Sequence, residues 1–308
     1  MAERADGQEV RVDVDGRTLT ISNLEKVLYP ETGTTKGEVL HYYAQVAPVL
    51  LPLLRDRAVT RIRWPHGTAD KSFFEKNAPQ GAPSWLRTAE VPTSGSRGES
   101  RYGDRLVFPV VESLADLTYL GNLAALELHV HQWKVDEDGQ PLNPDRMVID
   151  LDPGRPAGLH ECAQVALLVR DRLSALGLPA APVTSGSKGL HLYAPMPGDL
   201  TADQVRDAAK QIAEALEKEH PKLVLSQMTK AKRPGKVFLD WSQNTGSKTT
   251  ISPYSLRGTS APNVAAPRTW EEIEEGAEEL GDLVQLTHTE VLDRVEQHGD
   301  LFTGLLGV

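Results

Sequence analysis

The sequence predicts a mixed α/β (α+β) protein in which helices separate short strands that carry polar motifs. The apolar run that ends in Asp150-Leu-Asp152 has the composition of a short buried strand. Residues 159–176 then have apolar side chains at helical spacing, with Gly177 as a natural stop. A further helix is expected after Thr201, which opens a capping-box pattern. Strands and helices therefore alternate around the polar motifs.

The composition is that of a folded globular protein. With 308 residues and 40% hydrophobic content, the chain can form a full core. The longest apolar stretch, residues 46–54, is short and contains two prolines, and the N-terminus lacks the pattern of a signal peptide. We expect no membrane contact and a cytoplasmic location.

Cys162 is the only cysteine, which excludes intrachain disulfides and a zinc site built from cysteines. It is expected to pack inside the helix that follows the aspartate pair. A catalytic thiol is the alternative, but no nearby histidine supports it.

Charge is unevenly distributed over the chain, whose net charge is −10. Residues 222–257 contain seven lysines or arginines and a single acid, Asp240, which makes this region a candidate phosphate-binding face. A second basic segment, residues 55–76, is diluted by acids. The acidic residues gather in 271–282, which is predicted to be the solvated face of a late helix.

Two elements before the aspartate pair are predicted from local patterns. Thr35-Lys-Gly-Glu38 matches a capping box that opens an apolar helix, and Pro48 and Pro52 are expected to kink or end that helix. Residues 92–100 are rich in turn formers between two strand-like pieces, which predicts a long exposed hairpin or loop.

The aspartate pair is the strongest functional signal. A two-residue period places Asp150 and Asp152 on one strand face, roughly 6 to 7 Å apart, where both could reach one cation. Pro153-Gly154 is expected to end the strand as a turn. The alternative is that the second aspartate only forms this turn.

A glycine-rich motif follows in residues 184–193. Gly186 and Gly189 would let backbone amides approach an anion, and Ser185, Ser187 and Lys188 add hydroxyl groups and charge. The spacing is not that of a P-loop. In the strand after it, His191 and Tyr193 share a polar face, so His191 could donate to a phosphate, although an ordinary hydrogen-bonded histidine is the alternative.

The third motif brings Asp240 at the end of an apolar strand into the most basic part of the chain. Asp240 could be a structural ion-pair partner. Three strand-borne aspartates beside a glycine-serine-lysine loop are a better match to two-metal phosphoryl transfer, in which two cations lie about 3.5 to 4 Å apart.

These motifs resemble those of the archaeo-eukaryotic primase superfamily, and above all its bacterial end-joining branch, the polymerase domain of DNA ligase D. The resemblance extends from about Asn23 to the last helix. It includes Lys26-Val-Leu-Tyr-Pro30, Arg63-Trp-Pro65, Phe73-Phe-Glu-Lys76, Leu128-His-Val-His-Gln-Trp133, Gly246-Ser-Lys-Thr-Thr250 and Pro253-Tyr-Ser-Leu-Arg-Gly258. It implies a primase-polymerase fold with central, mainly antiparallel sheets, an RRM-like catalytic module and flanking helices.

The resemblance also implies roles for individual residues. Asp150 and Asp152 would bind both of two divalent cations, manganese or magnesium, and Asp240 would bind the cation that activates the primer 3′-hydroxyl. The residues expected to bind the incoming nucleotide are Ser185, Lys188, His191, Arg257 and His129. The family prefers ribonucleotides.

DNA contacts are implied for a further set of positions, namely Asn23, Lys26, Lys36, Arg63, Phe73, Phe74 and Arg233. Lys26 and Lys36, with Asn23 nearby, match the recognition of a 5′-phosphate, and Phe73-Phe74 matches a pair that stacks on the template strand. Taken without the resemblance, the lysines would be ordinary surface residues and the rings core residues.

Three points limit the resemblance. His129-Val-His131 could instead ligate zinc, although no third ligand is evident. The loop near residues 94–100 is longer than expected, and Ile62 stands where relatives can carry a basic residue.

The sequence is thus interpreted as a single catalytic domain over residues 1–308, with an N-terminal extension of about residues 1–20 and an acidic helical segment at 270–308. We expect a nucleotidyltransferase that fills gaps and extends 3′ ends in non-homologous end joining, acting on 5′-phosphorylated DNA ends with NTP or dNTP, near the bacterial nucleoid. The chain has no ligase Lys-x-Asp-Gly motif, so we expect either a domain excised from a longer ligase or a stand-alone polymerase that relies on a separate ligase. Ku and a DNA ligase are the expected partners. A metal-dependent phosphodiesterase and a non-catalytic module that binds DNA ends are the alternatives.

Overall fold

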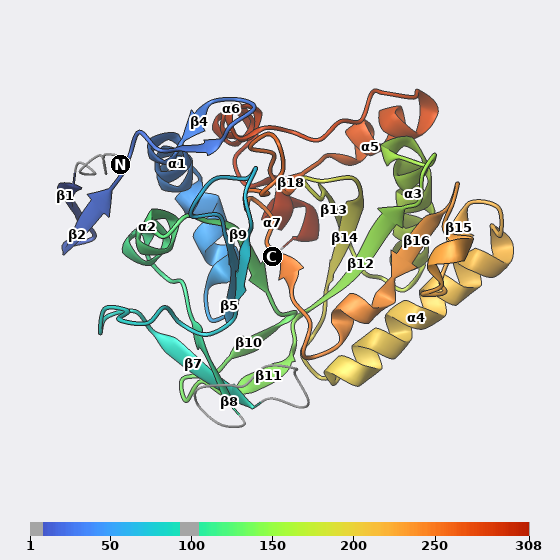
Figure 1. Cartoon of the computed structure of the whole chain (residues 1–308). Helices are drawn as coiled ribbons and strands as arrows, with labels where there is room; N and C mark the ends of the chain where they lie inside the picture. Colours follow the sequence, from blue (N-terminus) through green and yellow to red (C-terminus); the bar gives the residue numbers. More distant parts are fainter. Residues whose placement is uncertain (1–8, 93–104, 308) are drawn as a thin grey trace.

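The computed structural model describes residues 9–92 and 105–307. Two sheets form its centre, and helices pack against them (Figure 1). The six-stranded sheet has the order β15 (Val224–Leu225), β16 (Val237–Asp240), β12 (Arg146–Pro153), β14 (Leu190–Pro195), β13 (Ala181–Thr184) and β18 (Ala266–Pro267). The four-stranded sheet has the order β17 (Thr250–Ile251), β9 (Ala125–Val130), β5 (Val59–Arg63) and β6 (Phe73–Glu75).

The remaining strands form four two-stranded sheets. They are β1 (Glu9–Val14) with β2 (Arg17–Ser22), β3 (Val27–Tyr29) with β4 (Thr34–Thr35), β7 (Thr88–Pro92) with β8 (Arg105–Pro109), and β10 (Trp133–Val135) with β11 (Pro141–Pro144). The helices are α1 (Lys36–Leu54), α2 (Leu114–Asn122), α3 (Leu159–Ala175), α4 (Ala202–Glu219), α5 (Trp270–Glu278), α6 (His288–His298) and α7 (Leu301–Leu306), with 3-10 turns η1 (Lys230–Lys232) and η2 (Trp241–Asn244).

The predicted RRM-like module is present in the six-stranded sheet. Along the chain its elements run β12, α3, β13, β14, α4 and β16, and across the sheet the four strands lie in the order β16, β12, β14, β13. This is the β-α-β-β-α-β arrangement, with β12 antiparallel to both of its neighbours. The prediction of a mixed fold with mainly antiparallel sheets is therefore confirmed.

Each face of the six-stranded sheet packs against its own core. Ile149 and Leu192 belong to a cluster formed with α3 and α4. Val148 and Tyr193, which point the other way, belong to a second cluster formed with α1, β5 and β9. The face that carries Asp150 and His191 was expected to be polar, yet it is largely buried because the other half of the molecule lies against it.

The helix starts were predicted correctly because a capping box is a local signal. Thr35 and Glu38 cap α1 reciprocally, and Thr201 and Gln204 do the same for α4. Pro48 and Pro52 were expected to kink or end α1. The kink stays a prediction, but the helix does not end at either proline and continues to Leu54. Its burial against the core outweighs the backbone hydrogen bonds that the prolines cannot donate.

Several smaller expectations are also resolved. Cys162 is buried in α3, where burial raises the pKa of its thiol. Most acids between 271 and 282 are exposed. Strands β7 and β8 pair antiparallel as predicted, but the loop between them lies outside the described residues. Among the described residues, none of the helices combines the length and apolar character needed to cross a bilayer.

Candidate active site

Three strands bring the predicted catalytic residues together. Asp150 in β12 is paired in register with His191 in β14 and with Asp240 in β16. Burial alternates along β12, so that Asp150 and Asp152 lie on the face opposite Ile149 and Leu151. The two-residue period therefore placed both carboxylates correctly.

The expected turn at Pro153-Gly154 is wrong. Strand β12 includes Pro153, and Gly154 still bridges to Pro234 and donates its N–H to Lys236. The turn falls at residues 155 and 156. The strand therefore extends one residue past Asp152, and the aspartates lie in its C-terminal half, as expected, although the turn comes two residues later.

Asp150 is held by His191 and by a glutamine that the sequence interpretation did not include. Its Oδ1 lies 3.4 Å from His191 Nε2. Gln243 Nε2 lies 3.4 Å from Asp150 Oδ2 and 3.0 Å from Asp240 Oδ2, so one amide bridges two of the carboxylates. Burial acts to raise the pKa of Asp150, but the charge and hydrogen bond of His191 outweigh it, and the pKa is lowered.

Asp152 is held by two cations. Lys188 Nζ lies 2.6 Å from Oδ1 and Arg233 Nη1 lies 2.7 Å from Oδ2. Arg233 also packs over the ring of Phe238. Arg233 was expected to contact DNA, and the structure places its guanidinium against the Asp152 carboxylate. Its contact with DNA stays a prediction.

Asp240 caps η2. Its Oδ1 accepts hydrogen bonds from the backbone N–H and the hydroxyl of Ser242, and Lys248 Nζ lies 4.0 Å from its Oδ2. Lys248 also donates to the Ser242 hydroxyl. The structure therefore surrounds each aspartate with positive charge or hydrogen-bond donors.

The donor set suits hard divalent cations. Carboxylate oxygens are the preferred protein ligands of Mg²⁺ and Mn²⁺, and the Gln243 amide occupies a bridging position between Asp150 and Asp240 that a cation would favour. Within the described ranges, no three acidic, histidine or cysteine side chains already converge as a metal site. Asp152 turns toward Lys188 and Arg233, which would have to release it.

The glycine loop differs from the expected anion cradle. Ser185 Oγ accepts hydrogen bonds from the N–H groups of Ser187 and Gly189, and Gly186 N–H donates to Gln285 Oε1. These amides close the loop on itself and on Gln285, so they are not directed at an open site. Lys188 is 65% exposed, so its side chain can reach a phosphate from this loop.

Arg257 joins this loop to β9. Its Nε donates to the Ser185 carbonyl at 3.0 Å, and its Nη1 donates to Glu127 Oε2 at 2.9 Å. His129 Nε2 lies 2.7 Å from the same oxygen. Ser185, Arg257 and His129, all predicted to bind nucleotide, are therefore connected by hydrogen bonds.

Glu127 was missed in the sequence. Its signal is an acid inside the apolar strand β9, two residues before His129 and on the same face. Burial acts to raise its pKa, but the His129 hydrogen bond and the Arg257 charge outweigh it and lower the pKa to about 2. Glu127 is therefore ionised at neutral pH.

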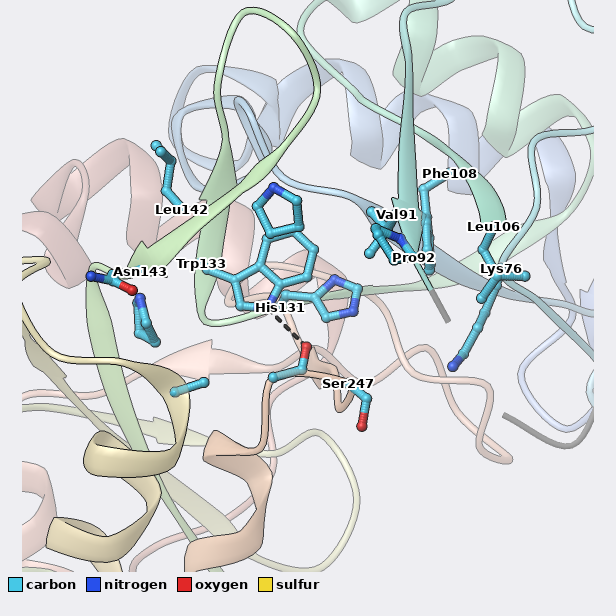
Figure 2. Close-up of a pocket in the computed structure, with 14 residues that line it drawn as sticks. Lys76, Val91, Pro92, Leu106, Phe108, His131, Trp133, Leu142, Asn143 and Ser247 are labelled. Carbon is cyan, nitrogen blue, oxygen red and sulfur yellow. Dashed lines mark hydrogen bonds between the residues drawn. The ribbon is translucent and has the colours of Figure 1, made fainter. Parts of the chain in front are cut away.

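The two histidines of the possible zinc site point to different places. His131 lies beyond the end of β9, and its ring stacks on that of Trp133 with 4.1 Å between the ring centroids. It lines a cavity of about 550 Å³, together with Lys76 and Phe108 (Figure 2). Burial lowers its pKa to about 3. His129 instead contacts Glu127, so the pair does not share a metal position.

The lysines expected to bind a 5′-phosphate are neighbours. The β3–β4 hairpin pairs the two segments, and Lys36 N–H donates to the Lys26 carbonyl. The Lys36 side chain is 4% exposed, and burial together with the Lys26 charge lowers its pKa to about 8. No carboxylate of the described residues forms an ion pair with either lysine. Asn23 precedes them with a φ of 57°.

The aromatic pair lies on the surface. Phe73 and Phe74, in the edge strand β6, are 43% and 60% exposed, so the alternative that both rings belong to the core is wrong. Arg63 lies opposite Phe73 and is fixed by Glu75 and the Leu123 carbonyl. These hydrogen bonds do not test the expected contact of Arg63 with DNA, which stays a prediction.

Comparisons with known proteins find a matching family model and similar sequences. A family model described as "LigD, primase-polymerase domain" matches residues 35–302. The multifunctional non-homologous end joining DNA repair protein LigD of Mycobacterium tuberculosis H37Rv is 47% identical over 292 residues, which are 93% of this chain and 37% of that protein. The bifunctional LigD of Bacillus subtilis is 32% identical over 282 residues, covering 91% of this chain and 43% of that protein.

A solved structure of similar form is the polymerase domain from Mycobacterium tuberculosis Ligase D in complex with DNA. It superimposes with a TM-score of 0.85 at 45% identity, over 94% of this chain and 98% of that chain. The present chain therefore spans well under half the length of these curated relatives but nearly all of a solved domain.

Proposed function

The chain belongs to the LigD primase-polymerase family of nucleotidyltransferases, and we propose that it fills gaps and extends 3′ ends of DNA during non-homologous end joining, as a single catalytic domain. The observation that carries this proposal is the register of β12. Asp150 lies between His191 and Asp240, so carboxylates suited to cations and side chains suited to a triphosphate share one sheet face.

The residues of the proposed site have complementary tasks. The proposed triphosphate ligands are Ser185, Lys188, His191, Arg257 and His129, and the proposed ligands of two divalent cations, manganese or magnesium, are Asp150, Asp152 and Asp240. When bound, the cations would neutralise the charge that develops on the transferring phosphoryl group. Lys188 and Arg233, which pair with Asp152, would have to release it before it could hold a cation, and Lys188 would then be free to bind the phosphates. A preference for ribonucleotides is part of the proposal.

DNA is held on other elements. Lys26, Lys36 and Asn23 would bind the 5′-phosphate of a gap, and Phe73 and Phe74 would stack on template bases, each for about 1 to 3 kcal/mol. Arg63 and Arg233 would add phosphate contacts. Since relatives that share this domain are named as end-joining proteins, we propose Ku and a DNA ligase as partners in the bacterial cytoplasm, at the nucleoid.

Primer extension tests the proposal against its alternatives. The substrate is a gapped, 5′-phosphorylated duplex with manganese, offered single ribo- or deoxyribonucleotides. Primer extension with a faster ribonucleotide reaction is the expected result. Shortening of the primer would instead indicate a phosphodiesterase, and a stable complex without reaction would indicate a binding module.

The 5′-phosphate site predicts a pH dependence. Because the pKa of Lys36 is lowered to about 8, Lys36 loses its charge as pH rises from 7 to 9, whereas the phosphate keeps its full charge over that range. The affinity ratio of phosphorylated to unphosphorylated gaps should therefore fall, by about tenfold if one charged hydrogen bond is lost. Fluorescence anisotropy with both duplexes at each pH measures this ratio.

Two variants control for this prediction. Lys36→Arg stays charged throughout, so its ratio should not change with pH. Lys26→Ala combined with Lys36→Ala should weaken binding to phosphorylated gaps far more than binding to unphosphorylated ones. An equal loss of affinity for both duplexes would refute a specific phosphate site.

A further inference from the structure

We propose that Glu127 is a positioning residue, which holds Arg257 and His129 in the orientation that receives the triphosphate of the incoming nucleotide. The inference rests on the proposed function and adds to it a residue that contacts the nucleotide-binding side chains rather than the nucleotide.

The contacts of Glu127 account for both carboxylate oxygens. Oε2 accepts from Arg257 Nη1 at 2.9 Å and from His129 Nε2 at 2.7 Å, while Oε1 accepts from the Gly258 N–H at 3.0 Å. The residue is 6% exposed. A buried carboxylate is stable only when it is paired and hydrogen-bonded, and these three donors meet that condition.

The guanidinium of Arg257 is fixed at two of its three nitrogens. Nε is bound to the Ser185 carbonyl and Nη1 to Glu127, whereas Nη2 has no hydrogen-bond partner among the residues that the structure describes. A planar guanidinium held at two nitrogens has its third nitrogen aimed in one direction. Gly186 leaves room for this placement, because a Cβ there would lie 2.7 Å from Arg257 Cγ.

The two possible effects of Glu127 on nucleotide binding, positioning of other side chains and repulsion of the triphosphate, predict opposite changes in affinity when its charge is removed. A negative carboxylate near a triphosphate site repels the ligand, so removing it would tighten binding if only charge mattered. If Glu127 instead orients Arg257 and His129, removing its charge weakens binding despite the lower repulsion. Partners that orient a binding side chain are typically worth about 10- to 100-fold at metal sites, which sets the scale here.

The experiment measures equilibrium binding of ATP with Mn²⁺ to the wild-type chain and to Glu127→Gln. We expect Glu127→Gln to bind ATP about tenfold more weakly. Glu272→Gln is the matched control, since Glu272 also forms ion pairs with two arginines and accepts from a backbone N–H but lies on α5. Its ATP affinity should equal that of wild type. Unchanged or tighter binding by Glu127→Gln would overturn the inference.

A double-variant cycle tests whether Glu127 acts through Arg257. In an Arg257→Ala background, Glu127→Gln should reduce the affinity for ATP much less than it does in the wild-type background. An equal loss of affinity in both backgrounds would overturn the inference. Wild type that binds no ATP would instead refute the proposed function and the inference with it.

Affinity for gapped DNA reports whether a variant retains the fold. If Glu127→Gln also loses affinity for gapped DNA, a second variant is needed. Glu127→Asp keeps the charge, and for the inference to hold its affinity for ATP must lie between those of wild type and Glu127→Gln.

Discussion

Replacement of Asp240 by Asn, or of Asp150 by Asn, should reduce primer extension by about a thousandfold or more, because either change removes a charge that the phosphoryl-transfer site requires. The two residues face each other across β12 and β16, and the Gln243 amide already links them. An Asn side chain keeps the shape but halves the number of oxygens and removes the negative charge. Rates on the gapped, 5′-phosphorylated duplex with manganese measure the loss.

Asp145→Asn is the matched control for this prediction. Asp145 immediately precedes β12, and its carboxylate binds Arg57 and Lys134 away from the three aspartates. It should extend primers at a rate close to that of wild type. All three variants should still bind the gapped duplex, since none of the substituted residues is among the proposed DNA contacts. Extension by Asp240→Asn within about tenfold of wild type would show that the catalytic site has been assigned wrongly.

Much of the site could be predicted because its signals are local. The two-residue period of a strand is enough to put Asp150 and Asp152 on one face, and a capping box fixes the start of α1 wherever that helix lies. The exposure of Phe73 and Phe74 agrees with the predicted template platform. The RRM-like order of β16, β12, β14 and β13 came from the resemblance, since no local pattern specifies which strands become neighbours.

The missed features depend on contacts between distant segments. Glu127 and Arg257 are 130 positions apart, so their ion pair exists only once the segment that follows β17 packs against β9. Tertiary packing also brings Gln285 onto the Gly186 amide, which is why the anion cradle expected from the glycine spacing differs from the observed loop. Arg233 belongs to a basic segment in the sequence, yet folding places it on Asp152.

Gly189→Ala should lower the free energy of unfolding by about 3 kcal/mol, since the added methyl group overpacks two paired strands. A Cβ at this position would lie 2.2 Å from the Leu151 carbonyl oxygen and 3.2 Å from Pro153 Cδ. The first atom is backbone between Asp150 and Asp152, so it cannot move aside without shifting both aspartates. Thermal unfolding should show a midpoint lower by about 5 to 10 °C.

The same substitution at Gly304 is the matched control, because Gly304 is exposed in the helix α7 and a Cβ there meets nothing within 4 Å. Gly304→Ala should raise stability slightly, by about 0.5 to 1 kcal/mol. At a temperature where Gly189→Ala remains folded, its primer extension should still fall, because relief of the clash displaces the β12 carboxylates from His191 and Asp240. Unchanged stability would show that the β12–β14 contact is looser than 2.2 Å implies. Lost stability with full activity would show that the loop, rather than β12, moves to make room.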